Sequence, residues 1–362
     1  MKRSTIMSIA GVAALALPAQ ALAENVEVVA SGIDNPRGLA LQSDSALYVA
    51  AAGRSGGTCA DKKKESCVGL SSRILRIDTA SGAKRTVAKG LVSIGGHEGL
   101  FTVGANGVAV AGKKVYAAIT SLETAKAISS LPSSARAQVG RLFQVAPGKR
   151  RTLARLDRYE QAHNVDGVKG DVNSNPYAVL ALKDRILVAD AGANAILQIR
   201  KGKLSTFAVL PRNGKAQSVP TSLAKGPDGA VYVGELAEGA GPGAARVFRV
   251  RASGGKPKVY ATGFTTITGI GFGPDKSLFV TELATEPPSE DGPPKPSGLV
   301  VRVGPDGVRT NLGAGKLNYP TGLAVSSKGE VYVSNNSTLP ASTPADGPFG
   351  GAGGQVVRIT GY

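Results

Sequence analysis

The chain of 362 residues carries 43 Lys and Arg against 26 Asp and Glu, a formal net charge of +17, with 48 Gly and no Trp. A hydrophobic content of 42% is enough for a buried core, and a charged content of 19% excludes a disordered polyelectrolyte. The many glycines and few aromatic residues indicate numerous turns and short strands. The excess of base permits an anionic partner without proving one.

A secretion signal, residues 1–23, is the first predicted element. Two bases precede an uncharged apolar stretch, residues 6–17, and a small-residue cleavage site ends at Ala23. The apolar stretch is short for a membrane span of about 20 residues, which favours cleavage over an uncleaved anchor. We therefore expect residues 24–362 to be exported, either to the periplasm or out of the cell. Export argues against a nucleic-acid partner.

The chain has two cysteines, Cys59 and Cys67, and both lie in one short polar segment. An oxidising compartment and a short intervening loop favour a disulfide between them. Two thiols with no histidine nearby are too few ligands for a structural metal. We expect the pair to staple a loop.

A repeated pattern runs through the rest of the chain. Each copy has a turn, a short apolar strand, a Gly or Asp turn and a strand of the type LYVA, followed by a second pair of strands. The six copies begin at Asn35, Gly104, Asn175, Val219, Thr266 and Tyr319. Period-two strands, glycine turns and a repeat of about 40–50 residues are typical of a β-propeller. The predicted fold is all-β, a six-bladed β-propeller of four-stranded blades.

The ring is expected to close through the N-terminal strand. The sixth copy ends at Tyr362 without a fourth strand, whereas residues 25–33 precede the first copy and resemble the other fourth strands. Pairing this strand with the last blade completes that blade and removes an exposed edge. A single propeller domain, residues 24–362, then accounts for the exported chain, and we expect it to be a monomer.

The path of the chain sorts the loops onto two faces. Strands alternate in direction within a blade, so the second-to-third loops and the links between blades share one face, and the tight turns occupy the other. We call the first the inserted face, because the long insertions lie there: residues 53–70, 121–138, 284–297 and 337–354. Helices are expected within 121–138 and 153–165. Long loops carry function more often than tight turns, which places the expected site on the inserted face.

Several segments resemble the ScyD/ScyE family of exported propeller proteins. The stretch VNSNPYAVLALKDRILVADAGANAILQI is the most specific, and PTGLAVSSKGEVYVSNN supports it. The resemblance covers nearly the whole exported chain. It implies an exported six-bladed propeller and brings no agreed catalytic mechanism, so it informs the fold more than the function.

Acidic side chains end three of the six second strands, and an amide ends a fourth. These residues are Asp190, Glu235, Glu282 and Asn335, and they are predicted to ring the mouth of the central channel. Carboxylate and amide oxygens suit a hard divalent cation such as Ca²⁺, and the three acids are the candidate metal ligands.

Two considerations bear on this metal hypothesis. Propeller lactonases of the gluconolactonase type hold a metal with such residues, but their first blade begins with Glu-Gly-Pro, which supplies a ligand. The present chain reads NPRGLAL at residues 35–41 instead. The alternative interpretation is that the acids pair with Arg54, Arg37 or backbone amides and only finish their strands.

Other candidates lie on the links of the inserted face. His97 with Glu98, or His163, could provide acid–base chemistry near neutral pH, although a satisfied polar loop residue is the commoner role. Asn-Pro at 175–176 shapes a turn and could also present ligand-binding groups. The ligand-binding candidates are Arg37, Arg54, His97, Glu98, His163, Asn173, Asn175, Tyr177 and Asn335. No catalytic residue is assigned, since HExxH and phosphate-loop motifs are absent from the sequence.

Three functions follow as hypotheses. The first is an exported binding or accessory protein for a small molecule, glycan or protein. The second is a metal-dependent hydrolase, such as a lactonase with Ca²⁺, and chelation would test it. The third is docking of the tight-turn face, where bases outnumber acids, to an anionic polymer of the cell envelope. Envelope attachment that high salt does not release would contradict the third.

Overall fold

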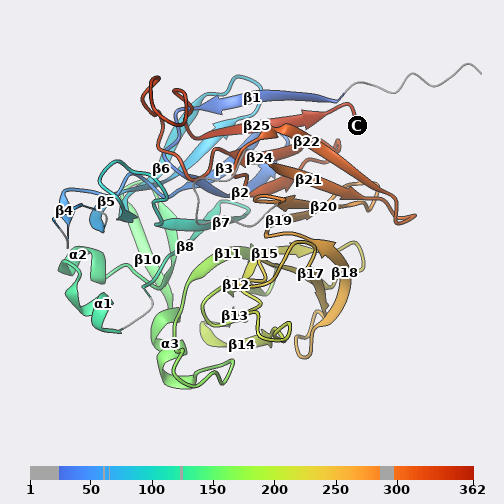
Figure 1. Ribbon diagram of the computed structural model, residues 1–362. Helices are drawn as coiled ribbons and strands as arrows, with labels where there is room; N and C mark the ends of the chain where they lie inside the picture. Colours follow the sequence, from blue (N-terminus) through green and yellow to red (C-terminus); the bar gives the residue numbers. More distant parts are fainter. Residues whose placement is uncertain (1–23, 60–61, 65, 123–124, 286–296) are drawn as a thin grey trace, which may run out of the picture.

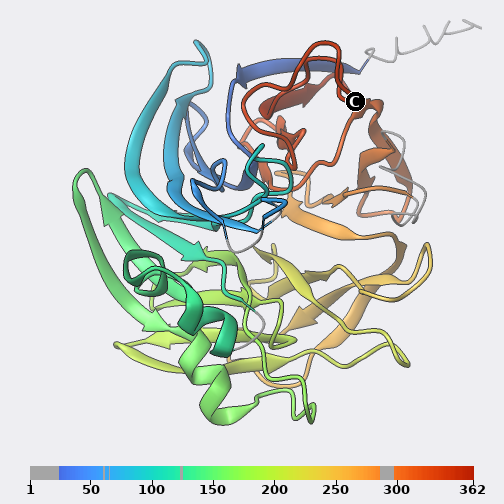
Figure 2. The same ribbon diagram turned by 60° about the vertical axis from the view of Figure 1, so that its left-hand side comes forward.

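The computed structural model describes residues 24–59, 62–64, 66–122, 125–285 and 297–362 (Figure 1). Six antiparallel sheets surround a central axis, as the two views show (Figures 1 and 2). The fold is therefore the six-bladed β-propeller that the repeat predicts. The expected signal, residues 1–23, and most of the insertion at 284–297 lie outside the described residues.

Each blade runs from an inner strand at the axis to an outer strand at the rim. Blade 1 contains β2 (Pro36–Ser43), β3 (Ala46–Ala51), β5 (Cys67–Asp78) and β6 (Lys84–Gly95), with the short β4 (Thr58–Cys59) added to β5. Blade 2 contains β7 (Ala105–Ala111), β8 (Lys114–Ile119), β9 (Arg141–Ala146) and β10 (Lys149–Arg155). Blade 3 contains β11 (Pro176–Ala181), β12 (Arg185–Asp190), β13 (Ala195–Arg200) and β14 (Lys203–Val209).

The second half of the ring follows the same plan. Blade 4 contains β15 (Pro220–Lys225), β16 (Val231–Glu235), β17 (Ala245–Val250) and β18 (Lys258–Phe264). Blade 5 contains β19 (Ile267–Phe272), β20 (Leu278–Glu282), β21 (Gly298–Val303) and β22 (Arg309–Leu317). Blade 6 contains β23 (Leu323–Val325), β24 (Val331–Asn335), β25 (Gln355–Thr360) and β1 (Asn25–Ser31).

The N-terminal strand closes the ring, as predicted. β1 pairs antiparallel with β25, from Asn25 opposite Thr360 to Ser31 opposite Gln355, and so supplies the outer strand of the last blade. At the axis, the Thr321 hydroxyl donates to the Pro36 carbonyl at 3.2 Å and joins blade 6 to blade 1. The two ends of the described chain are thus held in one sheet, and blade 6 has the same four strands as a complete blade.

The core lies between the blades. One cluster of buried apolar side chains sits at each blade interface, such as Tyr232 and Val247 of blade 4 against Ile270 and Val280 of blade 5. The corresponding cluster between blades 6 and 1 includes Tyr332 of β24. Each sheet packs against a neighbour on both of its faces, and the second strands are accordingly buried at every position, as in β3 and β16, which favours a ring over a sandwich.

The disulfide and the short helices agree with the sequence predictions, except at the start of one helix. Cys59 and Cys67 form a disulfide across β4 and β5, as expected. Helices α1 (Ala125–Ser130) and α2 (Ser133–Arg136) follow β8, and α3 (Leu156–His163) follows β10. The expected helical segment from residue 153 is wrong at its start, because β10 still pairs with β9 up to Arg155. Among the described residues, no helix has the length and apolar character to cross a membrane.

Candidate ligand site on the inserted face

A recurrent irregularity marks the point where the inner strands enter the channel. The register of β2, β7, β11, β15 and β19 against its neighbour shifts within the first residues of each strand. Such bulges re-aim a side chain, and here they set one residue per blade at the inserted-face end of the channel. We call these residues the mouth layer: Arg37, Asn106, Tyr177, Thr221, Thr268 and, just before β23, Thr321.

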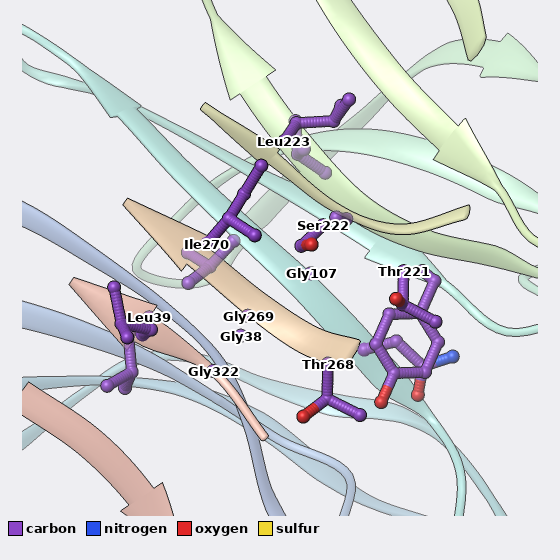
Figure 3. A pocket seen from close by; sticks show the side chains of 16 residues that line it. Gly38, Leu39, Gly107, Thr221, Ser222, Leu223, Thr268, Gly269, Ile270 and Gly322 are labelled. Atoms are coloured by element: carbon purple, nitrogen blue, oxygen red, sulfur yellow. The ribbon is translucent and has the colours of Figure 1, made fainter. Parts of the chain in front are cut away.

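Small residues lie one step below the mouth layer. Figure 3 shows Gly38, Gly107, Ser222, Gly269 and Gly322 facing the axis from five blades. They let the inner strands approach at backbone distance, and the space left inside the channel is only about 50 Å³. A ligand of ordinary size therefore does not fit inside the channel.

The expected metal ligands end their strands as predicted, but each is held within its own blade. Asp190 accepts hydrogen bonds from the Ser174 hydroxyl and the Asn175 backbone N–H, both at 2.6 Å. Glu282 accepts the Thr265 N–H at 2.8 Å. These side chains tie the incoming link to the second strand of the blade.

The remaining two members of the expected ring are held in the same way. Asn335 accepts the Asn318 N–H at 2.7 Å. Glu235 takes both Arg246 Nε at 2.5 Å and Arg246 Nη2 at 3.1 Å, and burial nevertheless raises the pKa of this carboxyl. Within the described residues, no three His, Cys, Asp or Glu side chains gather as a metal would require. The donors that the sequence suggested for Ca²⁺ therefore do not fit a shared cation site.

A cavity of about 460 Å³ opens on the inserted face beside these strand ends. Links and strand ends of blades 2 to 4 supply its walls: Val103, Thr120, Ser121, Leu122, Asn173, Ser174, Asn175, Ala191, Gly192, Gln217, Val219 and Glu238. Amide and hydroxyl groups alternate with small apolar patches, and no Lys, Arg or His lines it. Two of the sequence candidates, Asn173 and Asn175, lie in this wall.

Hydrogen bonds hold the polar side chains of the wall in place. Asn175 Oδ1 accepts the Thr120 hydroxyl at 3.1 Å, and its backbone is fixed by Asp190. Asp171 accepts the Asn173 and Gln217 amides at 2.5 and 2.9 Å, which links two blades across the cavity rim. Such prior ordering lowers the entropy lost when a ligand binds.

The other sequence candidates lie away from this cavity. His97 and Glu98 are exposed on the link between β6 and β7. His163 is exposed at the end of α3, where its ring stacks on Tyr159 with ring centroids 4.1 Å apart. The side chain of Arg54 is half exposed and lies 3.8 Å from an Asp34 oxygen. The structure does not bring the two histidines to one site.

Sequence reasoning missed Thr120, Ser121, Gln217 and Glu238. The first two follow Ile119, the end of the second strand of blade 2, which is the same repeat position that drew attention to Asp190 in blade 3. The sequence interpretation considered only the last residue of each second strand and not the two residues that follow it. Gln217 and Glu238 lie on links with no distinguishing pattern.

A buried carboxyl lies behind the loop that reaches the cavity. Glu160 of α3 is 1% exposed; one oxygen accepts the Val165 N–H at 3.2 Å and the other has no partner in the described structure. Burial, with smaller contributions from Asp190 and Asp166, raises the pKa of Glu160 to about 7. Burial likewise raises the pKa of Asp190 to about 6.

Replacing Glu160 with glutamine is expected to change the pH dependence of stability. The folded chain holds the Glu160 proton more tightly than the unfolded chain, so ionisation between about pH 4.5 and 7 lowers the free energy of unfolding by on the order of 2 kcal/mol. The free energy of unfolding of Glu160→Gln minus that of the native protein should therefore be larger at pH 8 than at pH 5. Denaturant unfolding at both pH values measures this. Glu238→Gln, which removes an exposed carboxylate, is the control; parallel curves for E160Q and the native protein would contradict the prediction.

The tight-turn face contrasts with the cavity in charge. The four tight turns of blades 2 and 3 and the strand ends beside them carry many bases and one acid, Asp184, which pairs with Arg185 at 2.9 Å and with Arg200 at 3.1 Å. The bases are Lys113, Lys114, Lys149, Arg150, Arg151, Lys183, Arg185, Arg200, Lys201 and Lys203. In blades 2 and 3, positive charge is thus dense on the face opposite the cavity.

The fold and the cavity define the class of protein: a six-bladed β-propeller with a polar cavity on its inserted face. The family described as SMP-30/Gluconolactonase/LRE-like region matches residues 149–334, about half of the chain, and the protein belongs to this family. No curated protein matches the sequence.

Solved structures support the same fold. The chain is similar to the PQQ-bound aldose sugar dehydrogenase from Streptomyces coelicolor, at 14% identity and a TM-score of 0.54 over 93% of this chain and 98% of that one. It is also similar to a gluconolactonase from Xanthomonas campestris, at 11% identity and a TM-score of 0.53 over 93% of this chain and 90% of that one. At these identities the likeness establishes the fold alone.

Proposed function

We propose that this protein is an exported binding or accessory module of the ScyD/ScyE type. It holds a small polar molecule in the inserted-face cavity. The observation that carries the proposal is the wall chemistry: amides, hydroxyls and one carboxylate at the exposed rim, Glu238, line about 460 Å³ without a single base, in a chain of net charge +17. The volume falls within the roughly 300–1,000 Å³ of small-molecule sites. The part of the ligand inside this cavity is uncharged and rich in hydrogen-bonding groups.

Binding rather than catalysis is favoured by where the reactive side chains lie. Both histidines are exposed outside the cavity, and Asp190 is engaged by Ser174 and Asn175. A general base must come within hydrogen-bond reach of its substrate, and the cavity wall offers one carboxylate, Glu238, at its exposed rim. The wall is suited to recognition by hydrogen bonds.

Filling the cavity is expected to abolish binding without unfolding the protein. The buried Ser121 hydroxyl lines the cavity and has no partner in the described structure, so Ser121→Leu adds apolar volume there and breaks no existing hydrogen bond. Native mass spectrometry of the purified protein, followed by thermal shifts with a panel of neutral sugars and polyols, identifies a binder. S121L should lose its thermal shift, and Ser121→Ala should retain most of it. Equal binding by the native protein and S121L would refute the cavity as the site.

A metal-dependent lactonase is the second candidate, and membership of the family is the observation in its favour. The hydrogen bonds on Asp190, Glu235 and Glu282 count against it, because each acid already has partners in its own blade. Titration of acid release from glucono-1,5-lactone, with and without Ca²⁺ and a chelator, separates the two candidates. Hydrolysis that the chelator abolishes and Ca²⁺ restores would favour the lactonase. No hydrolysis and no effect of the chelator on thermal stability would leave the binding module.

A further inference from the structure

Arg37, in the mouth layer, is a buried cation without a counter-ion. Its residue exposure is 8%, Nη2 donates to the Thr102 carbonyl at 2.9 Å, and Nε is buried with no partner in the described structure. No carboxylate of the described residues lies within ion-pair distance of it. Asp34, close in sequence, is 3.8 Å from both Arg54 and Arg73 instead.

The other deeply buried arginine shows what Arg37 lacks. Arg141 is 5% exposed and lies 2.5 Å from the carboxylate of Asp157, which is equally buried. Burying a charge is strongly unfavourable unless it is paired. One carbonyl does not compensate a guanidinium, whose five N–H donors match the two oxygens of a carboxylate or phosphate.

The mouth layer is asymmetric around the axis. In blades 4 to 6 the hydroxyls of Thr221, Thr268 and Thr321 donate to backbone carbonyls of the next blade, at 2.5, 2.9 and 3.2 Å. In blades 1 and 2, by contrast, Arg37 Nε and Asn106 Oδ1 are buried without partners among the described residues. Within the mouth layer, the buried polar atoms without partners among the described residues therefore belong to blades 1 and 2.

That half adjoins the cavity. Asn106 Nδ2 lies 3.4 Å from Asn175 Oδ1, and Asn175 is part of the cavity wall. Thr102, which accepts the Arg37 hydrogen bond, precedes Val103 of the same wall. Asn106 also lines the narrow channel, so it lies between the cavity wall and the channel, and Arg37 is its neighbour in the mouth layer of blade 1.

We propose that Arg37 binds an anionic group of the ligand, a carboxylate or a phosphate, at the channel mouth. Asn106 Oδ1 accepts a hydrogen from a hydroxyl or N–H beside that group. The inference rests on the proposed binding function and specifies where the ligand carries charge. Its uncharged polar body occupies the cavity, and its one anionic end is directed toward Arg37. The channel of about 50 Å³ below the mouth admits nothing larger than such an end.

The test compares probes that differ only in the anionic group. Glucose, glucuronate and glucose 6-phosphate share one body, and acetate and inorganic phosphate present the anion alone. Thermal shift and calorimetry at constant ionic strength are run on the native protein, Arg37→Gln and Lys113→Gln. The last variant removes one exposed charge from the opposite face. For the native protein, glucuronate or glucose 6-phosphate should bind about tenfold or more tighter than glucose, since a charge-assisted bidentate contact contributes about that much.

The two variants should respond differently. R37Q should lose the preference for the anion, keep any binding of glucose, and match or exceed the native melting temperature, because an unpaired buried charge has been removed. K113Q should bind as the native protein does. Preference for the carboxylate or for the phosphate probe distinguishes the two sources of the anion.

Other results would overturn either the role of Arg37 or the cavity as the binding site. Anion binding that R37Q leaves unchanged, or no anion effect on any of the three proteins, overturns the role of Arg37. Glucose binding that S121L abolishes, together with no anion preference, would refute the inference while sparing the proposed function. Anion binding that requires Arg37 but is unchanged in S121L would support the role of Arg37 and refute the cavity as the binding site. A melting temperature of R37Q far below the native value would mark Arg37 as structural.

Discussion

Replacing Gly322 with alanine is expected to destabilise the propeller by about 3 kcal/mol or more. Gly322 lies at the closure of the ring, where a Cβ would stand 2.2 Å from the Arg37 carbonyl oxygen and 2.8 Å from Leu39 N. Both are backbone atoms of the neighbouring inner strand, so no side chain can move aside. The strain would have to be relieved by spreading blades 6 and 1 at the axis.

Denaturant unfolding and the soluble yield of Gly322→Ala measure this effect. The matched control is Gly241→Ala, since a Cβ there meets nothing within 4 Å and its backbone is not left-handed. The control should stay within about 0.5 kcal/mol of the native protein. Equal stability of the two variants would show that the inner strands have more freedom than the geometry implies.

Replacing Asp157 with alanine is expected to lower the free energy of unfolding by about 3–5 kcal/mol. The change leaves the Arg141 guanidinium buried, with the Val139 carbonyl as its remaining acceptor among the described residues. Asp157 stands at the start of α3, which leads into the loop that walls the cavity, so Asp157→Ala should also weaken ligand binding.

Two further variants separate the charge from the local fold. Arg141→Met with Asp157→Leu removes both partners and should recover part of the stability, because the cost arises from one unpaired charge. Asp184→Ala breaks an exposed pair on the tight-turn face and should cost less than about 1 kcal/mol. A loss for D157A no larger than for D184A, measured by denaturant unfolding, would show that water reaches Arg141.

The sequence predicted the fold well because the information is local and repeated. Each strand carries its own period-two pattern, and six copies leave little choice of architecture. The closing strand could be inferred from a missing fourth strand after the last copy. The start of α3 could not, because Ala154 and Arg155 have helix-compatible side chains and only the pairing with β9 keeps them extended.

The sequence singled out two residues of the cavity wall but not the rest of it. Asn173 and Asn175 were found because Asn-Pro precedes a strand, whereas Gln217 reaches the same cavity from a link about 40 residues further on. The acids at 190, 235 and 282 occupy the predicted strand ends, yet hydrogen bonds within each blade take up their oxygens. A pattern shows which residue ends a strand, but not which neighbour it will meet.

By itself, therefore, the sequence determined the number of blades, the manner of closure, the sorting of loops onto two faces and the side on which the positive charge gathers. Those properties follow from strand periodicity and from the alternation of chain direction. The tertiary structure alone decided that Asp157 neutralises Arg141 while Arg37 remains unpaired. The physical reason is that pairing of buried charges depends on distances between residues remote in the chain, and no local pattern encodes those distances.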